Sequence, residues 1–266
     1  MNSAPLAGLS VLVTRPEASA RALCNRIVDL GGRACIQPML VIEALIASDP
    51  ARVQWQQTLG AGHAPDIAIF ISTNAVEHGL NALAAGANPY LQQHTRLFAI
   101  GTTTAQALHR HGLTSTCVAG AMTSESLLAH PDLQSLKGAR VLIFKGLGGR
   151  SLLATQLRGR GAEVIECPVY RRRQPSIDAT ELRSSLDQHE INTVSVASGE
   201  TLENLQRLIS AEYACRLLVV VPSSRVAALA AALPWRAIHC AANATDDATI
   251  DALADLATQY REQEIS

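Results

Sequence analysis

The chain contains two copies of one sequence pattern, and this internal repeat constrains its fold more than any other feature. Residues 11–38, VLVTRPEASARALCNRIVDLGGRACIQP, align without a gap over residues 141–168, VLIFKGLGGRSLLATQLRGRGAEVIECP. Three more segments recur in the same order with small changes of offset: 66–80 over 192–206, 96–108 over 216–228, and 121–128 over 243–250. The repeat predicts a duplicated unit of roughly 120–130 residues, a size that one hydrophobic core can support.

Each repeated segment begins with an apolar run, continues through a polar turn and ends in a helical pattern. The apolar runs are residues 11–13, 67–71, 97–100, 141–144, 194–197 and 217–221. Such uninterrupted runs are typical of parallel strands that are covered on both faces. Apolar residues recur at helical spacing between residues 20 and 30, and Thr103 and Gln106 have the spacing of a capping box. This alternation predicts an α/β chain with two flavodoxin-like domains, each built on a doubly wound parallel sheet.

The composition favours a globular protein without a nucleic-acid or membrane partner. Of the 266 residues, 48% are hydrophobic and 17% are charged, and the formal net charge is −1. Proteins that bind nucleic acids or membrane surfaces are usually more basic. The N-terminus lacks the long apolar core of a signal peptide, and no stretch approaches the ~18 apolar residues of a membrane-spanning helix. We therefore expect a soluble cytoplasmic protein.

Neither the cysteines nor the histidines form a metal-binding pattern. The six cysteines stand alone without a CxxC pair, and the eight histidines include no HExxH sequence. This spacing predicts neither a zinc site nor a disulfide framework, and reduced thiols fit a cytoplasmic protein. We therefore expect no metal ion.

The polar turns after the predicted strands are the places to look for a ligand site. In doubly wound sheets, ligands bind beyond the carboxyl ends of the strands, near the amino ends of helices. These turns are rich in Ser, Thr and Gly, and they are residues 14–16, 72–74, 101–104, 145–150, 198–200 and 222–225. Any single Ser or Thr there has the simpler interpretation of a helix cap. However, both copies keep a pair of hydroxyls at one matching turn, Thr103–Thr104 and Ser223–Ser224, which favours anion binding.

The glycine-rich stretch GLGGR, residues 146–150, raises the question of a nucleotide site. No Lys-Ser or Lys-Thr follows its last glycine, so it is not a P-loop, and its spacing differs from the GxGxxG dinucleotide motif. The matching turn in the first copy contains no glycine, so nucleotide binding is the less favoured interpretation. Both copies instead place a basic residue just after the strand, Arg15 in the first and Lys145 in the second. A cation near helix amino ends favours anions, carboxylates included.

Tyr170 is the candidate for proton chemistry. It is one of four tyrosines, and three arginines follow it in the sequence ECPVYRRR. Two interpretations are open: an amphipathic tyrosine packed at a domain edge, or a phenol, with an ordinary pKa of about 10, that acts as an acid.

Six motifs in this order resemble the uroporphyrinogen-III synthase family over nearly the whole chain. They are VLVTRP, FISTNAVEHG, AIGTTTAQAL, TSESLL, VLIFKGLGGRSLL with LRGRGAEVIECPVYRR, and VVVPSSRVAALA. The resemblance implies two α/β domains joined by a two-stranded linker, with the substrate held in the cleft between them. One domain would combine residues 1–37 with 173–266, the other would span 38–172, and the linker strands would lie near 36–42 and 165–173. Two positions depart from the family pattern, because Lys145 stands where arginine is more common and Ile71 where threonine is common.

The resemblance also implies an activity: a lyase that closes hydroxymethylbilane into uroporphyrinogen III in haem biosynthesis, inverting the last pyrrole ring and releasing water. Family members use no metal or organic cofactor, and a monomer is expected. Tyr170 matches the tyrosine of the family's PVY motif and would assist the loss of the hydroxyl group. The predicted substrate-binding residues lie mostly in turns that line the family's cleft and are Arg15, Ser72, Thr73, Thr103, Thr104, Lys145, Ser198, Gly199, Ser223 and Ser224.

Two alternatives stay open from the sequence. A non-enzymatic binding protein of the periplasmic type also clamps an anion or small molecule between two α/β domains, although such a protein needs a signal peptide. A transferase that uses a nucleotide or sugar phosphate would show a nucleotide-dependent rise in melting temperature, and we expect none.

Overall fold

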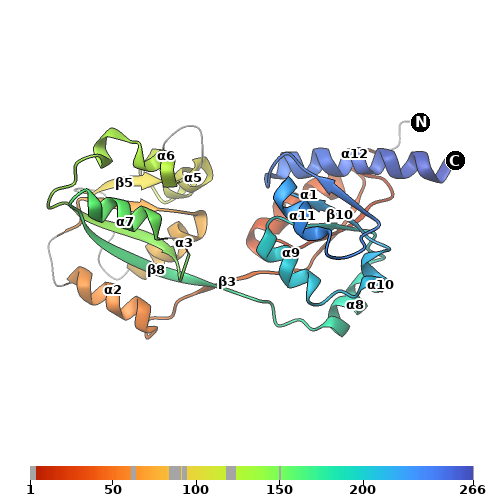
Figure 1. Ribbon diagram of the computed structural model, residues 1–266, viewed down its shortest axis with the longest axis horizontal. Helices are drawn as coiled ribbons and strands as arrows, with labels where there is room; N and C mark the ends of the chain where they lie inside the picture. Colours follow the sequence, from red (N-terminus) through yellow and green to blue (C-terminus); the bar gives the residue numbers. More distant parts are fainter. Residues whose placement is uncertain are drawn as a thin grey trace. The chain divides into compact units, whose positions relative to one another are not determined.

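The structure is a computed structural model and describes residues 4–60, 64–83, 91, 95–117, 124–149 and 151–265, with 260–265 described by backbone alone. The chain folds into two compact units (Figure 1): Met1–Val41 with Arg173–Ser266 form unit 1, and Ile42–Arg172 form unit 2. The chain therefore passes from one unit to the other twice, within strand β3 (Val41–Ala44) and at the end of strand β8 (Glu163–Arg173). The prediction of two α/β sheet units in one chain is confirmed.

Unit 1 is built on a parallel sheet. In the described part of the chain its strand order is β11-β10-β9-β1-β2, and the paired strands run parallel. The strands are β1 (Ser10–Val13), β2 (Arg33–Ile36), β9 (Thr193–Ser195), β10 (Leu218–Val221) and β11 (Ala237–Cys240). The helices are α1 (Glu17–Asp29), α8 (Ala179–Gln188), α9 (Gly199–Gln206), α10 (Ala211–Ala214), α11 (Ser224–Ala230) and α12 (Asp246–Ile265).

Both faces of the unit 1 sheet are covered by helices, which explains its uninterrupted apolar strands. One core cluster joins β1 to the buried side of α1, through Leu23 and Ile27, and to α12, through Leu253. A second cluster on the opposite face joins the sheet to α8, α9 and α11. All four residues of β1 are buried as a result. The apolar stripe on α1 is shorter than the sequence pattern, because the helix ends at Asp29 and Leu30 is its C-cap.

Unit 2 repeats this layered arrangement around a longer sheet. Its strand order over the described residues is β3-β8-β7-β4-β5-β6, and the pairs from β8 to β6 are parallel. The strands besides β3 and β8 are β4 (Ile67–Phe70), β5 (Arg96–Ala99), β6 (Thr116–Cys117) and β7 (Arg140–Gly146). The helices are α2 (Pro50–Gly60), α3 (Thr73–Leu83), α5 (Thr102–Arg110), α6 (Ser124–Leu128), the 3₁₀ turn η1 (Pro131–Leu133) and α7 (Leu152–Gly159).

The unit 2 core is divided by its sheet in the same way. Helices α2, α3 and α5 contribute to one cluster, and α6 and α7 contribute to the cluster on the other face. Phe70 and Phe144 stack across neighbouring strands with ring centroids 4.6 Å apart. Gly79 on α3 lies against this pair, and a Cβ there would approach the Phe144 ring to 3.0 Å. The glycine therefore lets α3 pack closely on the sheet.

The helix starts differ from the sequence prediction at one turn. The predicted capping box of Thr103 and Gln106 is wrong, because α5 begins at Thr102 and its N-cap is Gly101, with no side-chain cap. Gly101 has φ of 86°, a left-handed conformation that glycine adopts without a steric penalty.

Residues 121–123 of the repeated segment 121–128, and Arg150 of the glycine-rich turn, lie outside the described residues. Among the helices that are described, none has both the length and the apolar composition needed to cross a bilayer.

Candidate active site

The predicted site residues lie at the carboxyl ends of neighbouring parallel strands, separately in each unit. In unit 1 they follow β1, β9 and β10, which are adjacent in the sheet. In unit 2 they follow β4 and β5 or belong to the ends of β7 and β8, whose order is β8-β7-β4-β5. Parallel strands end at one edge of a sheet, so each unit brings its own set together, as expected for a doubly wound fold.

Tyr170 is held at this edge of unit 2 by Ser72, which follows strand β4, two strands away from β8 in the sheet. The Oη atom of Tyr170 lies 3.2 Å from the Oγ atom of Ser72. Ser72 also acts as the N-cap of α3, because its Oγ accepts a hydrogen bond of 3.1 Å from the Ala75 N–H. The residue Tyr170 itself is only 2% exposed and belongs to the core cluster of unit 2. A phenol, a serine and a helix amino end are thus linked in one chain of hydrogen bonds.

A glycine and a histidine enclose the Tyr170 ring. Strands β7 and β8 change register between Lys145 and Gly146, and this shift places Gly146 opposite Tyr170. A Cβ on Gly146 would lie 2.8 Å from two ring carbons of Tyr170, so any side chain there would displace the phenol. On the other side, the His78 ring lies 5.9 Å from the Tyr170 ring, measured between centroids. Burial lowers the pKa of His78, so its imidazole is neutral at pH 7.

Lys145, predicted to bind an anion, already has a carboxylate partner. Its Nζ donates to Glu166 Oε2 at 2.8 Å, and the residue is 9% exposed. Arg158 donates to the other carboxylate oxygen at 3.2 Å. Burial acts to raise the pKa of Glu166, but the hydrogen bonds and charges of Lys145 and Arg158 outweigh it and hold this pKa below the ordinary value. The positive charge of Lys145 is therefore shared with a carboxylate, whereas the sequence suggested a free cation at this turn.

This ionic cluster borders a hollow in unit 2. A cavity of about 530 Å³ is lined by the glycine-rich turn, by α2 and by β8. The glycines Gly148 and Gly149 both have positive φ, 77° and 80°, and a Cβ on either would meet nothing within 4 Å. Their conformation therefore sets the path of the turn, whereas Gly146 makes room for Tyr170.

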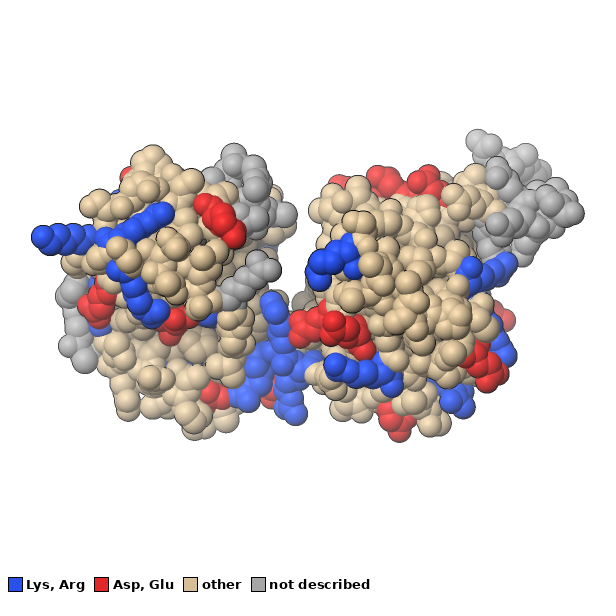
Figure 2. Space-filling view, in the orientation of Figure 1, with Lys and Arg blue, Asp and Glu red and all other residues tan. Residues whose placement is uncertain are grey.

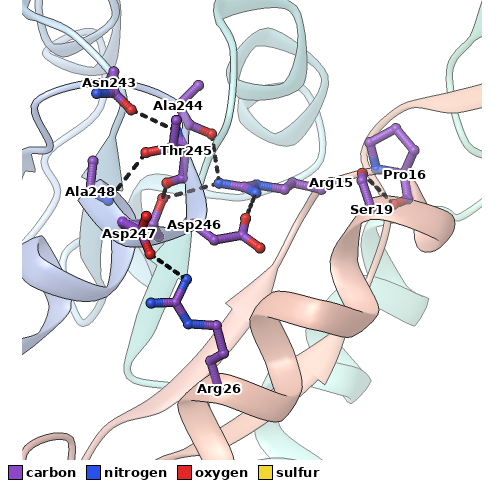
Figure 3. Close-up of polar contacts among 11 residues, drawn as sticks. Arg15, Pro16, Ser19, Arg26, Asn243, Ala244, Thr245, Asp246, Asp247 and Ala248 are labelled. Atoms are coloured by element: carbon purple, nitrogen blue, oxygen red, sulfur yellow. Dashed lines mark hydrogen bonds and ion pairs between the residues drawn. The ribbon is translucent and has the colours of Figure 1, made fainter. Parts of the chain in front are cut away.

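Arg15, the matching cation of unit 1, is buried and holds the start of α12 (Figure 3). It forms an ion pair with Asp246, and its Nη2 donates to the Ala244 carbonyl and to Thr249 Oγ1, both at 3.0 Å. The residue is 7% exposed. The guanidinium group therefore bridges β1 to the first turn of α12, and its charge is shared with a carboxylate.

The serines of unit 1 are helix caps, as the simpler interpretation of the sequence proposed. Ser198 Oγ accepts from the Thr201 N–H at 3.2 Å and lies 2.8 Å from Thr201 Oγ1. Ser223 Oγ accepts from the Val226 N–H at 3.4 Å. Gly199 and Ser224 are the first residues of α9 and α11. Capping uses only an acceptor site, so Ser223 keeps a hydrogen that could be donated to a ligand, and Ser198 keeps its hydrogen when Thr201 Oγ1 is the donor in their contact.

The turn after β5 offers a helix amino end without a side-chain cap. Helix α5 starts from Gly101, and no side chain accepts its first N–H groups. Thr103 is exposed there, as is Thr102, whereas Thr104 is buried, so the Thr104 hydroxyl does not face solvent. Thr73, the first residue of α3, is half-buried next to Ser72. Helices α1 and α7 also begin without a side-chain cap, which leaves partial positive charge at three strand ends.

Several contacts of the site had no signal in the sequence. Asp246 and Glu166 pair with the two predicted cations from 231 and 21 residues away, and no local pattern predicts such partners. His78 was visible as a histidine within FISTNAVEHG but had no spacing that pointed to Tyr170. Across the described ranges, no three His, Cys, Asp or Glu side chains gather in a way that could hold a metal ion.

Charged side chains are mixed over the surface that Figure 2 shows. Positive (blue) and negative (red) side chains are interspersed over both units in Figure 2. One group of Lys and Arg side chains lies where Figure 1 draws the end of β8. This segment carries Arg171, Arg172 and Arg173, the last two of which are exposed. Arg171 forms an ion pair with Asp49, so part of this positive charge is balanced.

Comparisons with known proteins agree with one another. The family model described as uroporphyrinogen-III synthase HemD matches residues 21–251. The uroporphyrinogen-III synthase of Escherichia coli (strain K12) is 37% identical over 261 residues, covering 92% of this chain and 100% of that protein. The same-named protein of Salmonella typhimurium (strain LT2) is 36% identical over 260 residues, with 92% and 100% covered. The solved uroporphyrinogen-III synthetase of Helicobacter pylori 26695 has a TM-score of 0.60 at 14% identity, covering 93% of this chain and 99% of that chain, and so shares the fold.

Proposed function

The chain belongs to the uroporphyrinogen-III synthase family, and we propose that it closes hydroxymethylbilane into uroporphyrinogen III with inversion of the terminal pyrrole ring and loss of water. The family assignment rests on the match over residues 21–251 and on relatives above 30% identity. The protein is accordingly a cyclising lyase of haem biosynthesis. Within the structure, the observation that carries the proposal is the contact of Tyr170 with Ser72 at the carboxyl edge of unit 2.

Loss of the hydroxyl group is the step that needs an acid. The pyrrole nitrogen pushes its electron pair toward the hydroxymethyl carbon, the C–O bond breaks, and the departing oxygen must receive a proton to leave as water. A phenolic hydroxyl can donate that proton at neutral pH. Tyr170 supplies it, because its oxygen is fixed in place by Ser72, Gly146 and the His78 ring. The rest of the catalysis is control of position, which decides the carbon that is attacked.

The carboxylates of the substrate are bound mainly by neutral donors. The chain has a formal net charge of −1, and the two cations at the strand ends share their charge with Asp246 and Glu166. Uncapped helix amino ends supply N–H groups and a positive potential equivalent to about half a charge each. The proposed ligands are the exposed or half-buried hydroxyl groups of Thr73, Thr103, Ser198, Ser223 and Ser224, together with the backbone N–H of Gly199, a buried residue at the start of α9.

Arg15, Lys145 and Thr104 stay in the proposed substrate-binding set with altered roles, and Ser72 stays as the residue that holds the Tyr170 hydroxyl. Arg15 and Lys145 shape the turns and add a weakened positive potential, since each is buried and paired. Thr104 contributes its place in the first turn of α5 rather than an exposed hydroxyl. The family resemblance further implies a cytoplasmic monomer that works without a metal ion, an organic cofactor, a nucleic acid or a membrane, and we include this in the proposal.

Separation of the porphyrinogen isomers tests the proposed function. When the protein is supplied with hydroxymethylbilane, we expect isomer III to form faster than isomer I forms in its absence. Isomer I alone, at the rate seen without protein, would reject the synthase activity. A binding protein without catalysis would give that result while still raising its melting temperature with substrate. A nucleotide-using transferase would instead be stabilised by a nucleotide, which we expect to leave the melting temperature unchanged.

A further inference from the structure

We propose that Ser72 passes the proton of Tyr170 to the departing hydroxyl group, so that Ser72, rather than Tyr170, touches the leaving oxygen. This rests on the proposed function and deepens it, because it reassigns Ser72 from carboxylate binding to the chemical step. Four features of the structure support it: the burial of Tyr170, the hydrogen-bond count at Ser72, the position of Ser72 at the start of α3, and the enclosure of the phenol.

Burial separates the two oxygen-bearing residues. Tyr170 is 2% exposed, whereas Ser72 is half-buried at the carboxyl edge of the sheet. A group that hands a proton to a substrate has to reach hydrogen-bond distance of it, about 2.6–3.2 Å between heavy atoms. Ser72 is exposed enough for a substrate to approach its hydroxyl. Tyr170 reaches the substrate only by passing its proton through Ser72, which lies 3.2 Å away.

The hydrogen bonds of the Ser72 hydroxyl indicate the direction in which the proton moves, from Tyr170 to Ser72. A serine hydroxyl has one hydrogen to donate and two acceptor sites. The Ala75 N–H occupies one acceptor site of Ser72 at 3.1 Å. Tyr170 Oη has no other hydrogen-bond partner among the residues that the structure describes, and a buried donor is costly to leave unpaired. Tyr170 therefore donates to the second acceptor site, and the Ser72 hydrogen is left to point toward a ligand.

Helix α3 makes Ser72 a better donor than an isolated hydroxyl. Its oxygen accepts from the first turn of an 11-residue helix, where the peptide dipoles create a positive potential. Two incoming hydrogen bonds withdraw electron density from the oxygen and polarise its remaining O–H bond. The same potential favours the negative charge that develops as the proton leaves.

Groups on two sides of the phenol restrict its rotation. Gly146 lies against its ring, and even the Oη atom is only 3.1 Å from the position of a Cβ on Gly146. The His78 ring encloses it from α3, and the carbonyl of Tyr170 accepts from the Leu147 N–H at 2.7 Å. Tyr170 is thus fixed with its hydroxyl directed at Ser72.

The proton balance closes over one turnover. As the C–O bond of the substrate breaks, the Ser72 O–H proton bonds to the departing oxygen and the Tyr170 O–H proton bonds to Ser72. Water leaves, and Tyr170 becomes a phenolate. When the unsubstituted carbon of the inverted pyrrole ring forms the final C–C bond, it loses its hydrogen as a proton, and the same two oxygens carry this proton back to Tyr170. No oxidant, reductant or other reactant is needed.

Substitutions at Ser72 test the relay against its alternatives. Ser72→Ala should lower kcat by about 100-fold or more, as Tyr170→Phe should, because general-acid catalysis contributes at least that factor. The double variant should be no slower than the slower single variant, since the two groups act as a unit. Ser72→Thr keeps the hydroxyl and should retain most of the wild-type kcat. The KM should stay within about threefold of the wild type in each variant.

Two controls separate the relay from the loss of a helix cap. Ser210→Ala removes a capping serine of the same geometry from α10, whose Tyr213 N–H donates to Ser210 Oγ at 3.4 Å. This change should lower the melting temperature without changing kcat. Ser72→Gly keeps most of the cap stability, because glycine is a tolerated N-cap, and should still lose the activity.

The relay is overturned if Ser72→Ala or Ser72→Gly keeps kcat within about twofold of wild type while Tyr170→Phe is slow. An increase in KM with kcat unchanged would overturn it as well and return Ser72 to carboxylate binding. Failure of the proposed function looks different, because the wild-type protein itself would then form no isomer III.

Discussion

The two copies of the repeat place similar elements at the carboxyl edge of their sheets but surround them differently. In unit 1, Ser198 caps α9 and its hydroxyl lies 2.8 Å from Thr201 Oγ1. In unit 2, Ser72 caps α3 in the same way, but its hydroxyl meets Tyr170. The repeat aligns Tyr170 with Leu40, a buried apolar residue of unit 1. We infer that both copies kept turns suited to binding, whereas the proton chemistry arose in the second.

The two strand-end cations show what the copies share. Arg15 pairs with Asp246, and Lys145 pairs with Glu166. Each cation is more than nine-tenths buried, so each needs its partner to avoid an uncompensated charge. The basic residue that both copies share therefore mainly fixes the conformation of the turn in which it lies. Its contribution to the positive potential at the strand end is smaller.

Removing the phenol should have the largest effect. Tyr170→Phe keeps the ring packed between Gly146 and His78 but removes the proton donor, so kcat should fall by about 100- to 10,000-fold. Steady-state kinetics with hydroxymethylbilane would measure the loss. Tyr213→Phe, the same change in unit 1 at a hydroxyl that donates to Asp187, should leave kcat unchanged. Equal kinetics of both variants would place the acid elsewhere.

A methyl group at Gly146 should damage both stability and rate. Its Cβ would lie 2.8 Å from the Tyr170 ring, and overpacking of this kind costs about 1–3 kcal/mol of unfolding free energy. Urea unfolding of Gly146→Ala would measure it. Gly60→Ala is the matched control, because nothing lies within 4 Å of that Cβ. An unfolding free energy for Gly146→Ala equal to that of Gly60→Ala would show that the ring is not held by this glycine.

Two adjacent aspartates on α12 should differ in their effect on stability. Asp246→Ala leaves the buried Arg15 guanidinium without its carboxylate and should cost about 1–3 kcal/mol, the penalty for an unpaired buried donor. Asp247 pairs with Arg26 at 2.8 Å but is 84% exposed, so Asp247→Ala should cost at most about 1 kcal/mol. Both residues lie in the first turn of the helix, which matches their interaction with the helix dipole. Similar losses in thermal unfolding would contradict the role given to Arg15.

Acid should weaken the Lys145–Glu166 pair in unit 2. Burial raises the pKa of Glu166, but Lys145 and Arg158 hold it below the ordinary value of 4.5. A carboxyl group with a lower pKa in the folded state stabilises that state above the ordinary pKa, and this stabilisation is lost as the pH falls through the folded-state pKa. The difference in unfolding free energy between wild type and Glu166→Gln should therefore be full at neutral pH and shrink below pH 4.5.

Urea titrations between neutral and acidic pH would measure this difference. Glu212→Gln is a suitable control, because Glu212 is 74% exposed in its pair with Arg216 and such pairs add little stability. A difference between wild type and Glu166→Gln that does not change with pH would mean that the carboxylate is not stabilised in the folded protein.

The sheets and their polar turns were predictable because their signals are local. Continuous apolar runs predicted the strands, and the order of turns along the chain predicted one edge in each unit. The partners of Arg15 and Lys145 were not predictable, since ion pairs between distant segments depend on the completed fold. The capping box at Thr103 failed because α5 begins two residues earlier, with Gly101 in a left-handed conformation as its N-cap.

The glycine-rich turn shows most clearly why composition alone misleads. GLGGR suggested a phosphate loop, and its spacing argued against one. In the structure, Gly146 admits the Tyr170 ring and the following glycines set the path of the turn. A register shift between β7 and β8 brings Gly146 and Tyr170 together, and a single sequence contains no signal for such a shift.

The most direct test of the account is the isomer ratio and rate of porphyrinogen formation by wild type and by Tyr170→Phe, measured side by side with hydroxymethylbilane. The account predicts isomer III from both proteins, rapidly from wild type and slowly from the variant, because the variant keeps the turns proposed to bind the substrate. Isomer I as the main wild-type product, or a variant as fast as wild type, would contradict it.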